Sequence, residues 1–182
     1  ADRLHGARNG VPLMPHLSGL AGRSVAFTRA VTPCTWTRPA MASLFTAQYP
    51  AAHGVMYGMR EGGVGDALGE SAETLAEYLA AHGYDTYGVQ TNSNVSRKHG
   101  LAQGFAADRY AFSNGRDAAW VTGKALEALD RVEPPFLLYA HFMDTHAPYE
   151  APAEYMAGFG PAPELTDTDR KLLEPDNFIP FL

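Results

Sequence analysis

The sequence predicts an α/β fold in which helices cover both faces of a parallel sheet. Two one-faced helical patterns, at residues 72–82 and 117–132, alternate with two strand patterns, at 86–90 and 136–142. The second strand pattern is an almost unbroken apolar run, which is typical of a strand that is covered on both faces. This alternation indicates a layered α/β sheet, and we expect 136–142 to be an interior strand.

The N-terminal part is expected to hold two helices and one strand. An amphipathic pattern at 13–22 predicts a short helix, and the period-two alternation at 24–31 predicts a strand. Thr37 has the pattern of an N-cap, with Pro39 in the first turn of a helix that runs to Phe45.

The middle of the chain contains a loop and then the clearest helix. Residues 50–70 are rich in glycine and show no periodicity, so we expect a long surface loop there. Ser71 is expected to cap the helix over 72–82, and Gly83 is expected to end it. The second helix ends before Pro134, which precedes the apolar strand.

Composition excludes several classes of protein. The chain has 182 residues, 46% of them apolar, which is enough for one domain core. Its net charge of −6 argues against nucleic acid or an anionic membrane as the main partner. No apolar stretch approaches the roughly 18 to 20 residues of a membrane span. The single cysteine, Cys34, excludes an intrachain disulfide and a multi-cysteine zinc site, and it is compatible with any compartment.

Polar residues stand at the expected helix start and strand ends, where open α/β sheets build their sites. Thr37 places a hydroxyl at a helix start that favours an anion. Asp144 and His146 follow the apolar strand, where an imidazole can act on a substrate oxygen. Asn92 and Asn94 follow the preceding strand and supply uncharged donors. The same residues also suit a helix cap, turns and an exposed surface, so structural interpretations stay open.

Four blocks of the sequence carry a resemblance to a known family. They are residues 2–17, residues 37–50 with the following His53, residues 74–86, and residues 135–149. In this order they resemble the sulfatase family of the alkaline-phosphatase-like superfamily. In that family a C-x-P-S-R stretch leads to L-T-G-x-Y-P, and a later block reads PFFLY-hFxDxHxPY.

The resemblance implies a three-layer alkaline-phosphatase-like sheet and a single partial catalytic domain over residues 1–182, without the family's first strand and C-terminal half. The family's nucleophile is a Cys or Ser that is converted to formylglycine. Its position falls on Thr37, because Thr46 and Tyr49 then match the later landmarks. The resemblance also implies a divalent ion (Ca, Mg, Mn or Zn) with Thr37 as one ligand. The other ligands would lie outside residues 1–182, so we expect little turnover by this chain alone.

The chemistry implied by the resemblance is a metal-assisted displacement on a sulfate or phosphate ester of a small molecule or glycan. Thr37 would attack sulfur or phosphorus, and His146 would protonate or hydrogen-bond the leaving oxygen. We therefore expect Thr37 and His146 to converge on one pocket, with their side chains roughly 5 to 9 Å apart so that one tetrahedral anion fits between them. The ester would be bound by Arg38, Asn92, Asn94 and Asp144. A threonine nucleophile also resembles the branch of phosphoethanolamine transferases and lipoteichoic-acid synthases. A phosphodiesterase, a phosphoethanolamine- or phosphoglycerol-type transferase, and a non-catalytic ester-binding relative therefore stay open.

Overall fold

The structure is a computed structural model that describes residues 6–8, 10–56, 66–146, 151–157, 160, 164 and 166–168. It divides into two compact units, Ala1–Thr28 with Ala151–Leu182, and Arg29–Glu150, and each is described by itself. The expectation of one partial domain over residues 1–182 stays a prediction. Within the described residues, no helix combines the length and the apolar character that crossing a bilayer requires.

The first unit contains short elements only. Strands β1 (Ala7–Arg8) and β2 (Val11–Pro12) pair antiparallel, and helices α1 (Pro15–Ala21) and α6 (Ala153–Met156) complete the described part. The helix predicted over 13–22 is therefore confirmed, although it begins at Pro15, where proline is well tolerated in the first turn.

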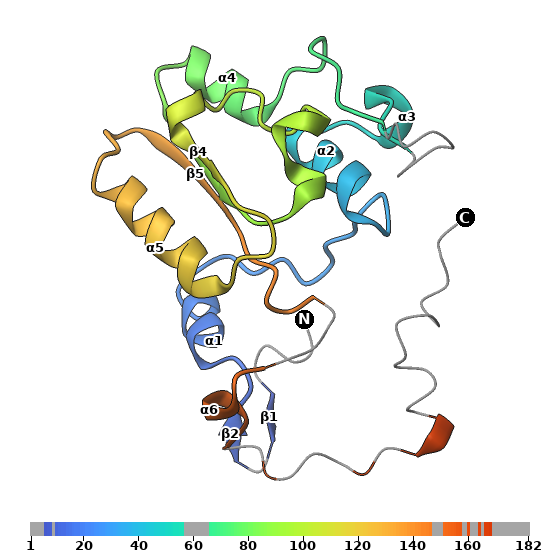
Figure 1. Cartoon of the computed structure of the whole chain (residues 1–182), viewed down its shortest axis with the longest axis vertical. Helices are drawn as coiled ribbons and strands as arrows, with labels where there is room; N and C mark the ends of the chain where they lie inside the picture. Colours follow the sequence, from blue (N-terminus) through green and yellow to red (C-terminus); the bar gives the residue numbers. More distant parts are fainter. Residues whose placement is uncertain are drawn as a thin grey trace. The chain divides into compact units, whose positions relative to one another are not determined.

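The second unit is built on a parallel sheet (Figure 1). Its elements are α2 (Thr37–Thr46), α3 (Pro50–His53), α4 (Leu75–Ala81), β3 (Asp85–Gln90), η1 (Ser93–Val95), η2 (Arg97–His99), η3 (Ala107–Arg109), β4 (Tyr110–Phe112), α5 (Ala118–Leu129) and β5 (Phe136–His141). The strand order is β4-β3-β5, and both pairings are parallel. The central strand of the described sheet is therefore β3, and the prediction that 136–142 is interior is wrong for this sheet. An apolar run indicates that both faces of a strand are covered, but it does not indicate whether the strand has a neighbour on one edge or on both.

Helices cover both faces of this sheet, which confirms the layered α/β fold (Figure 1). Tyr87 of β3 pairs in register with Leu138 of β5, and both line the same narrow space as Ala128 of α5. On the opposite face, the ring of Tyr139 meets that of Phe45 of α2 edge-on, with 5.0 Å between the ring centroids. The helix α4 also packs against β3.

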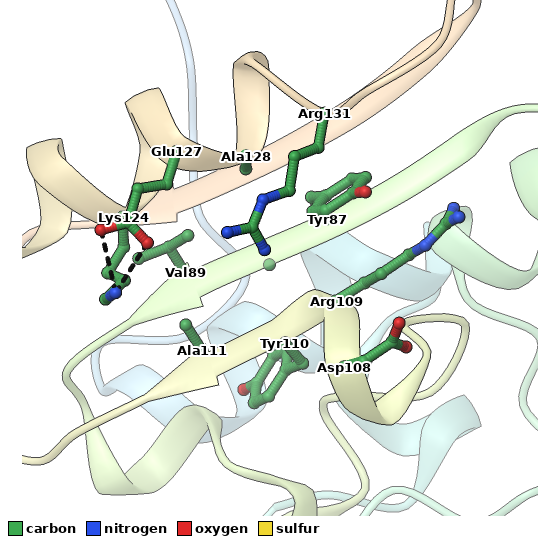
Figure 2. A pocket seen from close by; sticks show the side chains of 11 residues that line it. Tyr87, Val89, Asp108, Arg109, Tyr110, Ala111, Lys124, Glu127, Ala128 and Arg131 are labelled. Carbon is green, nitrogen blue, oxygen red and sulfur yellow. Dashed lines mark hydrogen bonds and ion pairs between the residues drawn. The ribbon is translucent and has the colours of Figure 1, made fainter.

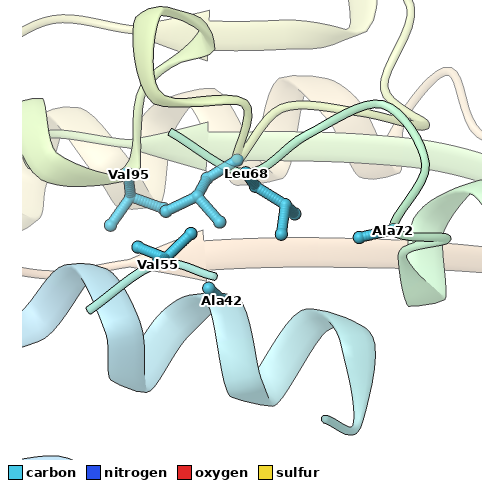
Figure 3. Close-up of a cluster of buried hydrophobic side chains, with 6 residues drawn as sticks. Ala42, Val55, Leu68, Ala72 and Val95 are labelled. Atoms are coloured by element: carbon cyan, nitrogen blue, oxygen red, sulfur yellow. The ribbon is translucent and has the colours of Figure 1, made fainter. Parts of the chain in front are cut away.

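The apolar core lies between α2 and the irregular segments that precede α4 and follow β3 (Figure 3). Its buried members are Ala42, Val55, Leu68, Ala72, Val95 and Leu101. The prediction of a surface loop over residues 50–70 is therefore wrong in part, since Pro50–His53 form α3 and both Val55 and Leu68 are buried. Single apolar residues in irregular backbone have no period, so no sequence pattern reports their burial.

The helix predicted over 72–82 begins later than expected. Its N-cap is Thr74, whose Oγ1 accepts from the Glu77 N–H at 3.2 Å, while Glu77 Oε2 accepts from the Thr74 N–H at 2.9 Å. The prediction that Ser71 caps the helix is wrong, because the helix begins only at Leu75 and the capping box is formed by Thr74 and Glu77. Gly83, with φ +82°, ends the helix as predicted.

The strand predicted over residues 24–31 is wrong. The segment is irregular, and Val25, Phe27 and Val31 are 84%, 82% and 90% exposed. Period-two alternation supplies one apolar face, but a strand also needs a hydrogen-bonding partner, and this segment pairs with none of the described strands.

Candidate functional site

The carboxyl ends of β3 and β5 lie at the same edge of the sheet because the two strands are parallel and Gln90 pairs with His141. The segments that follow these strands are joined by Asn92, whose Nδ2 donates to Met143 Sδ at 3.3 Å. The candidate residues that follow each strand therefore lie near the same edge of the sheet.

Thr37 is the first residue of α2, so the helix begins one residue earlier than predicted. Trp36 is the N-cap, with an extended backbone (φ −129°, ψ 160°), and its carbonyl accepts from the Ala40 N–H at 3.3 Å. The prediction that Thr37 is the N-cap is therefore wrong. Pro39 remains in the first turn, where backbone N–H groups have no acceptor within the helix. The position of the proline is therefore compatible with either Trp36 or Thr37 as the N-cap. Thr37 itself is half-buried.

Arg38 connects the start of α2 to two other segments. It is 4% exposed, and its Nη2 donates to Asn94 Oδ1 at 2.9 Å and lies 3.3 Å from His99 Nε2. Its Nη1 donates to the carbonyl oxygen of Asp66 at 3.2 Å, and its Cζ lies 5.6 Å from the centroid of the Trp36 ring. Burial lowers the pKa of Arg38 and the nearby Asp66 opposes that shift, but a guanidinium remains charged at neutral pH.

His99 accepts from Arg38 as a neutral imidazole. Burial is the main cause that lowers the pKa of His99, and the charges of Arg38 and Lys98 lower it further. Because a guanidinium only donates, His99 Nε2 is the acceptor of that contact and the ring proton sits on Nδ1.

Asn92 and Asn94 form a turn directly after β3. Asn92 is 7% exposed, its N–H donates to Gln90 Oε1 at 2.6 Å, and its Oδ1 accepts from the Asn94 N–H at 2.9 Å, which starts η1. The turn interpretation is therefore confirmed. It leaves Asn92 Nδ2 directed toward a thioether, which is a weak acceptor, so this buried donor can take a stronger one.

Asp144 and His146 are both exposed and lie in the turn after β5. Asp144 Oδ1 accepts from the Ala118 N–H at 2.9 Å, so this carboxylate helps to cap α5 together with Asp117. The N–H of His146 donates to the carbonyl oxygen of Met143 at 2.8 Å. The convergence of Thr37 and His146 on one pocket stays a prediction, and the rest of the block to Tyr149 lies outside the described residues.

The described residues do not by themselves fit a divalent metal ion. Over residues 6–8, 10–56, 66–146 and 151–157, no three His, Cys, Asp or Glu side chains come together. A Thr37 hydroxyl alone falls far short of the roughly six oxygen ligands that Mg²⁺ or Ca²⁺ requires.

A separate cavity of about 270 Å³ lies between α5 and strands β3 and β4 (Figure 2). Three of its charged side chains form ion pairs. Lys124 Nζ lies 2.7 Å from Glu127 Oε2, and Arg109 forms an ion pair with Asp85. These ion pairs indicate neither a ligand nor a reaction for this cavity.

Two further residues of this region, Tyr110 and Met143, were missed by the sequence analysis. Tyr110 Oη accepts from Gln90 Nε2 at 3.0 Å, and Met143 contacts Asn92 as described above. Neither a buried tyrosine hydroxyl nor a thioether has a sequence signature. Tyr110 begins a strand of three residues, too short for its alternation to be recognised.

Comparisons with known proteins agree with this fold. The chain resembles a 2-O GAG sulfatase, with a TM-score of 0.58 and 22% identity over 82% of this chain and 35% of that one. It also resembles a sulfatase-family protein from Bacteroides thetaiotaomicron VPI-5482, with a TM-score of 0.59 and 21% identity over 83% of this chain and 35% of that one. The chain thus spans about a third of the length of these two proteins. No curated protein matches it.

The family itself is established over nearly the whole chain. The sequence model of the family described as Sulfatase matches residues 4–179. Sulfatases act on sulfate esters and generally use a divalent metal ion. The extent of this match shows that the chain belongs to the sulfatase family.

Proposed function

We propose that the protein carrying this chain is a metal-dependent, sulfatase-like ester hydrolase in which Thr37 is the nucleophile. The observation that carries the proposal is the meeting of three distant segments. Arg38, beside Thr37, donates to Asn94 after β3, and Asn92 donates to Met143 after β5. The proposed nucleophile, ester-binding amides and acid therefore belong to segments that contact one another.

In the proposed reaction, Thr37 Oγ attacks the sulfur or phosphorus of the bound ester and gives its proton to water. The bond to the alcohol oxygen breaks, and a protonated His146 gives its proton to that oxygen as it leaves. Water then attacks the ester on Thr37, which releases sulfate or phosphate with a proton and regenerates the hydroxyl. The first N–H groups of α2, a helix of ten residues, favour the anionic group beside Thr37.

The remaining candidates divide into groups that bind the ester and groups that support them. The amides of Asn92 and Asn94 donate to the ester oxygens. Arg38 contributes its positive charge and holds Asn94 through Oδ1, which leaves the Asn94 Nδ2 to donate. Asp144 keeps the segment of His146 beside α5 through its bond to Ala118, and its second oxygen is proposed to contact the substrate.

The proposed substrate is a sulfate or phosphate ester of a small molecule or glycan. Thr37 stands where the family's formylglycine precursor is Cys or Ser, and this favours phosphoryl transfer as the second candidate. Assays of the full-length protein with an aryl sulfate, an aryl phosphate and a phosphodiester separate the two functions.

Substitution of Thr37 tests the proposal directly. Thr37→Ala is expected to lower turnover by about 10³-fold or more, because the bond-forming oxygen is lost. Since Thr37 is not the N-cap, the free energy of unfolding should fall by less than the roughly 1 kcal/mol that a lost cap costs. Thr122→Ala on the exposed surface of α5 is the matched control. Retention of more than about a tenth of the activity by Thr37→Ala would overturn the proposal.

A further inference from the structure

A chain of buried hydrogen bonds runs from β4 to the turn after β3. Tyr110 Oη donates to the carbonyl oxygen of Val95 at 2.5 Å and accepts from Gln90 Nε2 at 3.0 Å. Gln90 is fully buried, and its Oε1 accepts from the Asn92 N–H at 2.6 Å. The hydroxyl of Tyr110 thus holds the turn at both of its ends.

The ring of Tyr110 is fixed by its neighbours. It lies across Gly88, where an added Cβ would come within 2.6 Å of Tyr110 Cδ2. The Phe105 ring packs beside it with 5.7 Å between centroids, and Arg97 Cζ lies 5.2 Å from the centroid of the Tyr110 ring. The position of the hydroxyl is therefore set by the sheet.

Each bond in this chain has only one direction. Burial raises the pKa of Tyr110 to about 12, so the phenol keeps its proton at neutral pH. That single proton goes to Val95, and Gln90 must then present its amino group to Tyr110 and its oxygen to Asn92. With Asn92 Oδ1 used by the Asn94 N–H, the Asn92 Nδ2 is directed toward Met143.

We infer that Tyr110 is a positioning residue, whose hydroxyl acts through Gln90 to hold the Asn92 side-chain amide as a donor to an oxygen of the sulfate or phosphate ester. The inference rests on the proposed function, in which Asn92 binds the ester. It adds a residue of a different strand, whose hydroxyl bonds to Gln90 and Val95. Asn92 is 93% buried and its Nδ2 faces the Met143 thioether, a weak acceptor, so this donor gains most from a charged oxygen.

The test is Tyr110→Phe in the full-length protein, with Tyr87→Phe as the matched control. Tyr87 lies on the same sheet but on the face covered by α5. Tyr110→Phe is expected to speed exchange of the Asn92 and Asn94 amide protons about tenfold and to raise KM for an aryl ester about tenfold with little change in kcat. Tyr87→Phe should change neither quantity.

A double-mutant cycle separates positioning from general loosening of the fold. In an Asn92→Ala background, Tyr110→Phe should raise KM less than about twofold, because the group through which Tyr110 acts is gone. Additive effects would overturn the inference, and so would unchanged exchange at Asn92. If Tyr110→Phe does not fold, Gln90→Met breaks the same chain one link further on, with the same expected results.

The outcomes also distinguish this inference from the proposed function. Faster exchange with unchanged KM, in a protein that Thr37→Ala inactivates, overturns the role of Tyr110 and leaves the proposed function standing. A wild-type protein that turns over none of the three esters overturns the proposed function and this inference with it, and that result is independent of Tyr110.

Discussion

Arg38 and Asn94 lie 56 residues apart in the sequence, and Nη2 of the first donates to Oδ1 of the second at 2.9 Å. The same guanidinium reaches the Asp66 carbonyl, so one buried cation links α2 to the loop before α4 and to the turn after β3. Arg38 therefore holds these segments together and also gives the region a positive charge.

Arg38→Gln should lower the free energy of unfolding by about 1–3 kcal/mol, because Asn94 Oδ1 and the Asp66 carbonyl lose a buried donor. Arg38→Lys should restore little of it, since one ammonium cannot reproduce the planar fork. Urea unfolding measures both, with Arg29→Gln at an exposed site as the control. Full stability of Arg38→Lys would contradict the linking role.

The start of α4 supplies a second prediction. Thr74→Ala should cost about 1–2 kcal/mol, because it removes the capping box and a bond to the Gln103 carbonyl. Ser71→Ala, at the exposed position that the sequence pattern favours, should change stability by less than about 0.5 kcal/mol. Thermal unfolding of the two variants distinguishes them, and equal losses would argue against the capping box.

Two glycines should respond to alanine in opposite directions. At Gly88, a Cβ would meet the Tyr110 ring at 2.6 Å, and Phe105 restricts movement of that ring. Gly88→Ala should therefore cost about 1–3 kcal/mol. Gly123 lies within α5 with open space around it, so Gly123→Ala should stabilise by about 0.5–1 kcal/mol. Denaturant unfolding of both variants checks the two signs.

Stability should also fall as the pH falls below neutrality. Burial lowers the pKa of His53, whose Nδ1 accepts from the Val55 N–H and whose Nε2 bonds to Ser43 Oγ at 2.9 Å. The unfolded histidine, with a pKa near 6.5, takes up its proton first as the pH falls. The stabilisation from neutral His53 is therefore complete above about pH 6.5 and declines below it.

Urea unfolding at about pH 7.5 and pH 5.5 measures this decline, and His53→Gln should make it smaller. Burial also lowers the pKa of His99 and His141, so the variant should retain part of the slope. An unchanged slope in His53→Gln would exclude His53 as a source of the pH dependence.

The elements that the sequence predicted well have a periodic pattern or a local signal. The helix α5 has Asp117 as its cap and buries Val121, and the strand β5 has a continuous apolar run. The strand β4 and the burial of Val55 could not be predicted, because they depend on partners far away in the sequence. Residues 24–31 show the opposite case, because they have the alternating pattern of a strand but pair with none of the described strands.

The sequence identifies the candidate residues of the site but not the groups to which they form hydrogen bonds. The family blocks and the strand ends identified Thr37, Asn92 and Asn94 together. The partners of Arg38 and Asn92 were not predictable, because a hydrogen bond between distant segments leaves no periodic trace. A cap and a first helical residue share one sequence pattern, so only the backbone conformation shows that Thr37 follows the N-cap Trp36.

The parallel sheet has a consequence for how the chain acquires its structure over time. Asp85 of β3 pairs with Phe136, roughly fifty residues later, and β4 contributes three paired residues on the other edge. Such distant pairings lower the folding rate, because the chain loses loop-closure entropy before the contacts form. Until residues 136–141 have been synthesised, β3 therefore lacks its partner on one edge. A strand edge without a partner can pair with another chain, so residues 85–90 are exposed to aggregation during that interval.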